Sequence, residues 1–128
     1  MLKDCPSHAT LPAADLARAR AFYEDTLGFE PMSVNPGGVF YQAAGTRFFV
    51  FPTAAAASGS HTQMGFTVPD IEAEVADLQS RGVEFESYDM DGFDKELRIF
   101  TGGPVRSAWF RDSEGNLLGI VQFIGSAE

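Results

Sequence analysis

The sequence has too little of several features that major protein classes need. It contains a single cysteine, Cys5, which excludes an internal disulfide. Nine Lys and Arg stand against eighteen Asp and Glu, and the resulting net charge of -9 would repel nucleic acid. A mean hydropathy of -0.07 and frequent charges exclude a membrane span. The first four residues lack the apolar stretch of a secretory signal, so we expect a reducing, cytoplasmic setting.

What remains is the composition of one folded domain. Of the 128 residues 45% are hydrophobic and 21% are charged, which suffices for one buried core. The acidic excess is uneven, because residues 1–60 carry a net charge of -1 and residues 61–128 carry -8. Such an excess is typical of a solvated surface, and the alternative is that it attracts a cationic ligand.

An internal repeat organises the chain. Asp15 and Asp70 each follow a short apolar strand pattern and precede a helical pattern, where an Asp side chain can cap the first turn. Gly28 and Gly82 stand where each helix should end, since glycine adopts the positive φ of a C-terminal cap without steric cost. Three short strands follow each helix. The sequence therefore predicts a β-α-β-β-β module twice: about 6–53, a linker at about 54–60, and about 61–125.

The expected strands after the helices are 30–34, 38–44 and 47–52 in the first module, and 83–88, 105–111 and 117–123 in the second. The stretch 89–104 between them is long for a loop in a compact domain, which makes it a candidate lid. One helix covers only one face of each sheet, so we expect the two uncovered faces to enclose a cleft. Strand alternation points His8, Thr10, Gln63 and Thr67 into that cleft.

Several sequence motifs, spread over nearly the whole chain, resemble those of the vicinal oxygen chelate superfamily. They are the repeat itself, the run from His8 to Leu16 with Leu27-Gly28-Phe29, and the ending from Ala108 to Asn116. This superfamily includes glyoxalase I, extradiol dioxygenases, fosfomycin-resistance thiol transferases and bleomycin-resistance binding proteins. The resemblance implies an α+β fold with an incomplete barrel-like cleft, and it implies a homodimer.

The resemblance also implies where a metal would be held, because metal-dependent members have four ligand positions. His8 matches the first, whereas Gln63, Gly119 and Phe49 occupy the other three, with Phe51 on the same strand face as Phe49. A catalytic metal needs about three protein ligands. The alternative is that His61 joins His8 and Gln63 in an atypical site, but we expect that no metal or other cofactor is bound.

The residues at and beside the four metal-ligand positions suggest a pocket for a small molecule. We expect Phe49 and Phe51 to form an aromatic wall, Gly119 to leave space, and Tyr41 and Trp109 to add stacking surface at the rim. The predicted function is metal-independent binding of an aromatic or amphipathic small molecule, with a cation favoured, as in drug-sequestering proteins. No catalytic residue is assigned. The alternatives are a glyoxalase-type lyase or thiol transferase with an atypical metal site, and a structural or regulatory protein whose cleft is closed by side chains.

Overall fold

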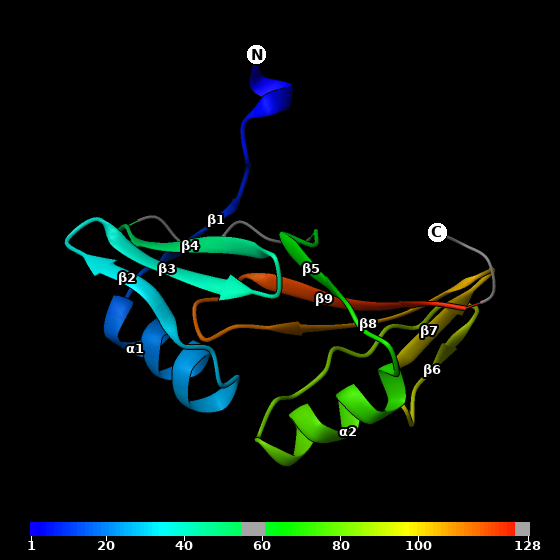
Figure 1. The fold of residues 1–128 in the computed structure, drawn as a ribbon. Helices are drawn as coiled ribbons and strands as arrows, with labels where there is room; N and C mark the ends of the chain where they lie inside the picture. Colours follow the sequence, from blue (N-terminus) through cyan, green and yellow to red (C-terminus); the bar gives the residue numbers. More distant parts are fainter. Residues whose placement is uncertain (55–60, 125–128) are drawn as a thin grey trace.

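The computed structural model describes residues 1–54 and 61–124, and it contains two β-sheets with one main helix beneath each (Figure 1). The first sheet has the strand order β1-β4-β3-β2 and the second has the order β5-β9-β8-β7-β6. The sheets do not close into a barrel, which agrees with the predicted α+β fold and incomplete cleft. In the described part of the chain, no helix is long and apolar enough to cross a membrane.

The strands of the first sheet are β1 (Ala9–Ala13), β2 (Pro31–Asn35), β3 (Gly38–Ala43) and β4 (Thr46–Pro52). Those of the second are β5 (Met64–Thr67), β6 (Phe93–Asp94), β7 (Ile99–Gly102), β8 (Val105–Arg111) and β9 (Leu117–Phe123). The helices are η1 (Leu2–Asp4), α1 (Leu16–Ala21), its π-helical continuation η2 (Phe22–Thr26), and α2 (Ile71–Ser80). Five of the six strands expected after the helices are present, with ends within one residue of the prediction.

Both helices begin and end as their capping residues predict. The Asp15 carboxylate accepts from the Arg18 amide at 3.1 Å, and the Asp70 carboxylate accepts from the Ala73 amide at 3.2 Å. Gly28 and Gly82 have φ of 84° and 92°, the left-handed conformation expected of a helix cap. The last turn of the first helix is π-helical, which the apolar spacing of the sequence does not reveal.

The segment before β8 differs from the prediction in two ways. Residues 83–88 make only an isolated bridge, between Phe85 and Phe110, instead of a full strand. The expected lid at 89–104 is instead a hairpin of β6 and β7 that pairs with β8. The reason is that the edge of β8 needs a hydrogen-bonding partner, and burial of Ile99, which is 2% exposed, fixes the hairpin in the core.

One apolar core runs under both sheets. Leu11, Val39 and Val50 are buried in the first module, and Phe110 and Ile120 are buried in the second. Aromatic rings connect the two halves: the Phe66 ring lies 6.0 Å from that of Phe29 and 6.4 Å from that of Phe48, measured between centroids. Of the expected linker at 54–60, only Ala54 belongs to the described residues.

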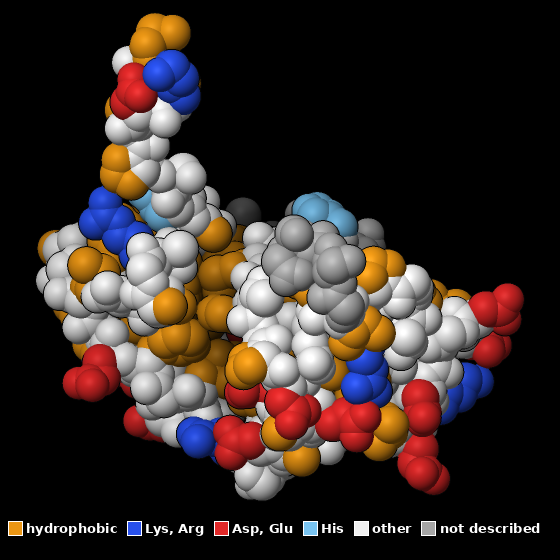
Figure 2. Space-filling model, turned by 45° about the vertical axis from the view of Figure 1, so that its right-hand side comes forward, with side chains coloured by type: hydrophobic (Ala, Val, Ile, Leu, Met, Phe, Trp, Pro, Cys, Tyr) orange, Lys and Arg blue, Asp and Glu red, His pale blue; other side chains and the backbone are white. Residues whose placement is uncertain are grey.

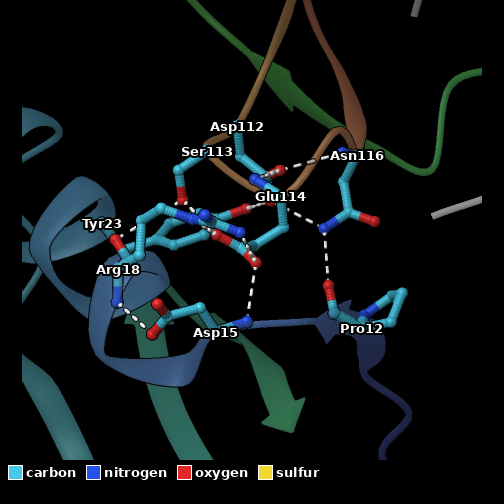
Figure 3. A network of polar contacts seen from close by, with 8 residues as sticks. All are labelled: Pro12, Asp15, Arg18, Tyr23, Asp112, Ser113, Glu114 and Asn116. Carbon is cyan, nitrogen blue, oxygen red and sulfur yellow. Dashed lines mark hydrogen bonds and ion pairs between the residues drawn. The ribbon is translucent and has the colours of Figure 1, made fainter. Parts of the chain in front are cut away.

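A polar network also joins the modules, because the turn between β8 and β9 lies against the first helix (Figure 3). The buried Tyr23 hydroxyl donates to the Asp112 carboxylate at 2.6 Å. The Asn116 side-chain amide donates to the same carboxylate at 2.7 Å and to the Pro12 carbonyl at 3.0 Å. Burial and the neighbouring Asp112 raise the pKa of Tyr23, which keeps its hydroxyl a proton donor.

The same turn places Glu114 at the start of α1. Its carboxylate accepts from the Asp15 amide at 2.9 Å and from the Arg18 guanidinium at 2.7 Å and 3.0 Å. The Glu114 side chain is fully buried, whereas that of Arg18 is 55% exposed. Chiefly because of the bond from Arg18, the pKa of Glu114 falls from 4.5 to about 2. We call this set of contacts the inter-module clamp: Pro12, Asp15, Arg18, Tyr23, Asp112, Glu114 and Asn116.

The depressed pKa of Glu114 predicts a pH-dependent contribution to stability. Because the folded-state pKa is lower than the unfolded one, the contribution is fully present above about pH 4.5 and disappears as the pH falls to about 2. Glu114→Gln should cost about 1 kcal/mol at neutral pH, allowing for solvent screening at Arg18. Thermal unfolding between pH 2 and 8 checks this: the two melting curves should converge near pH 2. The exposed-site variant Glu30→Gln should not separate from the native protein, and a constant gap for Glu114→Gln at every pH would contradict the assignment.

Candidate functional site

The first sheet presents a continuous row of rings on the face opposite α1. We call His8, Phe40, Phe49 and Phe51 the aromatic row. Ring centroids are 5.1 Å apart for His8 and Phe40, 4.5 Å for Phe40 and Phe49, and 6.4 Å for Phe49 and Phe51. The pairing of Phe49 with Phe40 on one side and with Thr10 on the other sets this alignment. The three phenylalanines are half-buried and His8 is exposed, so the row forms part of the surface.

Glycine in the neighbouring strand lets the Phe49 ring lie close to the sheet. A Cβ atom at Gly38 would stand 2.6 Å from the Phe49 ring and 2.4 Å from the Val50 carbonyl oxygen. Gly38 also has a φ of 144°, which other residues rarely adopt. The low, aromatic surface that results is suited to stacking against a planar molecule.

A pocket opens beside His8, at the boundary between the modules. It encloses about 550 Å³ including its mouth, and its walls include His8, Arg47, Met64, Gly65 and Phe66. The Arg47 guanidinium lies over the Phe40 ring, 5.2 Å from its centroid. Because no carboxylate lines this pocket within the described residues, its local charge gives no preference for the cationic ligand that we expected.

The uncovered face of the second sheet carries its own aromatic cluster around Trp109. The indole nitrogen donates to the Thr62 hydroxyl at 3.0 Å, and the indole ring meets Tyr88 edge-on at 5.5 Å. His61 and Met90 join these residues around a second pocket, of about 510 Å³ including its mouth. His8 and His61 therefore line different pockets.

Two of the second-module candidates are engaged in the sheet itself. The space expected beside Gly119 is filled, because a Cβ atom there would stand 3.2 Å from Thr62 and 3.3 Å from the Trp109 ring. The Gln63 side-chain oxygen accepts from the Leu117 amide at 3.3 Å, which fixes it across the β5–β9 pair. Thr67 is exposed at the end of β5, on the margin of a third pocket that lies on the helix side.

Tyr41 lies on the core face and not at the rim where we expected it. Its side chain is fully buried, its ring stacks on Tyr23 at 5.6 Å, and its hydroxyl donates to the Glu24 carboxylate at 2.8 Å. Burial and the contact with Glu24 raise the pKa of Tyr41. Phe40, which the sequence reasoning missed, occupies the exposed face instead. The signal was available: the short turn after Ala43 pairs Phe40 with Phe49, so both must share a face.

The donor atoms at these positions do not fit the metal centre that the resemblance implies for metal-dependent members. Of the four ligand positions, one carries an imidazole, one an amide already bonded to the backbone, one a phenyl ring and one no side chain. Within residues 1–54 and 61–124, no three His, Cys, Asp or Glu side chains are grouped to hold an ion. We derive no reaction step through a metal at this site.

Gly119 provides a test of how the Trp109 cluster is packed. Gly119→Ala should push the indole away from Thr62, because the new methyl group would stand 3.3 Å from its ring. Trp109 is the only tryptophan in the chain, so its fluorescence emission should shift to the red as the ring gains water. Gly65→Ala is the matched control, since the nearest atom to its new methyl group is 3.7 Å away. Equal spectra for both variants would show that the indole is not confined at Gly119.

One family model and several solved structures are similar to this chain. Residues 6–120 match the model of the Glyoxalase/Bleomycin resistance protein/Dioxygenase superfamily. None of the curated proteins compared with the sequence is significantly similar to it. Among solved structures, a glyoxalase family protein from Enterococcus faecalis shares 21% identity with a TM-score of 0.70, over 94% of this chain and 99% of that one.

Two further structures come from proteins named for antibiotics. TnmS3, an antibiotic binding protein from Streptomyces sp. CB03234, is 23% identical with a TM-score of 0.64, over 93% of this chain and 98% of that one. FosX, a fosfomycin resistance protein from Listeria monocytogenes, is 20% identical with a TM-score of 0.69, over 94% and 93%. At such identities these likenesses concern the fold. The family match, which covers most of the sequence, shows that the chain belongs to the Glyoxalase/Bleomycin resistance protein/Dioxygenase superfamily.

Proposed function

We propose that this protein binds a planar aromatic small molecule, without a resident metal, against the aromatic row of the first sheet. The observation that carries the proposal is the row itself, in which Phe49 stands where metal-dependent members are expected to offer a ligand and Phe51 lies beside it on the same strand face. Their rings are stacked with an interplanar angle of 11°. Such a surface favours stacking over coordination.

The surroundings of the row indicate the chemistry of the ligand. His8, Thr10 and Arg47 supply hydrogen-bonding groups at its margin, and Arg47 adds a positive charge. An aromatic compound with a carbonyl or acidic substituent suits this combination better than a cation does. The pocket beside His8 adjoins this margin of the row and offers space for a substituent of the ligand.

The named relatives and the exposed row support the same proposal. One structural neighbour is called an antibiotic binding protein, and another is called a resistance protein. Sequestration of an aromatic antibiotic requires a binding surface of this type and no catalytic residue. We also propose that the protein forms a homodimer, and sedimentation at several protein concentrations tests this.

Replacing one ring of the row tests the binding site. Phe49→Ala should weaken binding of anthraquinone-2-sulfonate about tenfold in isothermal titration calorimetry, because the stacking surface is lost. Phe123→Ala, which removes a 40% exposed ring at the end of β9, should leave the affinity unchanged. Melting temperatures of both variants distinguish loss of contact from loss of folding. The cation 9-aminoacridine, of similar shape, should bind more weakly than the sulfonate.

Three results would contradict this proposal. The first is equal affinity of the native protein and of folded Phe49→Ala. The second is failure of the native protein to bind either compound. The third is a near-stoichiometric transition metal in the purified protein that His8→Ala removes, which would favour the alternative of a glyoxalase-type lyase or thiol transferase.

A further inference from the structure

A separate apolar groove lies on the helix side of the sheets, between the end of the first helix and α2. It encloses about 580 Å³ including its mouth, and apolar side chains dominate its lining: Leu27, Phe29, Phe66, Val68, Leu78, Phe110 and Ile120. In the space-filling view, hydrophobic side chains line a hollow between the two halves of the molecule, with acidic side chains along its lower margin (Figure 2). We call the groove that these seven residues line, together with Thr67 and Glu74, the helix-side groove. It contains no residue of the aromatic row, although Phe66 also lines the pocket beside His8.

The groove exists because the two modules meet only in part. Phe29 and Phe66 stack at 6.0 Å across the boundary. Below this pair, Leu27 and Val68 stay half-buried, and Leu78 and Ile120 of the core also border the hollow. An apolar hollow of this kind is costly to hydrate, so it favours the apolar body of a ligand.

Among the described residues of the lining, Glu74 on α2 is the charged one, and Thr67 is polar without a charge. Its acidic neighbours on the helix are paired, since Glu72 binds Arg106 at 2.9 Å and Asp77 binds Arg81 at 3.1 Å. Within the described part of the chain, Glu74 has no ion-pair partner. A half-buried carboxylate beside an apolar wall would gain most from a cation that brings its own apolar surface.

We propose that the helix-side groove binds an amphiphilic organic amine, with its apolar body between the modules and its ammonium group on the Glu74 carboxylate. The charge of the groove selects this class. An anion of the same shape would face Glu74 directly, and a neutral molecule would leave the carboxylate without a partner. The ligand therefore differs in charge and in location from the one proposed for the aromatic row.

Three probes with one apolar body test the proposal: 4-phenylbutylamine, 4-phenylbutan-1-ol and 4-phenylbutyrate. In calorimetric titrations at pH 7, the amine should bind about tenfold tighter than the alcohol, and the butyrate should bind weakest. Glu74→Gln should reduce the affinity for the amine to that for the alcohol and leave the alcohol unchanged. Glu72→Gln, on the same helix but paired with Arg106, should not alter the binding of any probe.

Further variants separate this site from the aromatic row. Phe49→Ala should keep the amine affinity, and Glu74→Gln should keep the affinity for anthraquinone-2-sulfonate, so either site can fail alone. Equal affinities for the three probes, or an unchanged amine affinity in Glu74→Gln, would overturn the proposal. Absence of amine binding together with a dimer that Val68→Asp dissociates would overturn it too, because the groove would then be an interface between copies.

Discussion

The placement of one module against the other depends on the acidic turn that connects the last two strands. Its Asp112 and Glu114 carboxylates accept hydrogen bonds from Tyr23, Asp15 and Arg18, all of them in or beside the first helix. Buried carboxylates must be hydrogen-bonded to be tolerated, so these contacts admit few other orientations of the two modules. The pocket beside His8 and the helix-side groove both lie at this boundary. Their shapes therefore depend on how the two modules are oriented.

Aromatic side chains both fill the core and form a surface, because neighbouring residues of a strand point to opposite faces of the sheet. Tyr41 and Phe48 point into the core, and Phe40 and Phe49 form the exposed row on the opposite face. The second sheet repeats the arrangement with Trp109 and Tyr88 on its uncovered face. A chain with twelve phenylalanines can therefore fill a small core and still keep rings for a surface.

Much of the fold could be predicted from the sequence because it is repeated. The cap residues Asp15, Asp70, Gly28 and Gly82 act through local backbone chemistry, which a single sequence displays. The β6–β7 hairpin could not be predicted in this way, since its pairing with β8 is a tertiary contact between weak strand patterns. The candidate site was harder to predict than the fold. The faces of His8, Thr10 and Phe49 follow from alternation, whereas the space beside Gly119 depends on where the Trp109 ring turns.

The inter-module clamp also makes the duplicated halves unequal. In the first module the corresponding turn is only Ala44 and Gly45, which offers no carboxylate. The position in α2 that matches Arg18 is Ala73, which offers no guanidinium, and the start of α2 is met instead by the Gln122 side chain, 2.9 Å from the Ile71 amide. Donor and acceptor have thus specialised in opposite repeats. A chimera of two identical halves would lose one member of this pairing, whichever half was chosen.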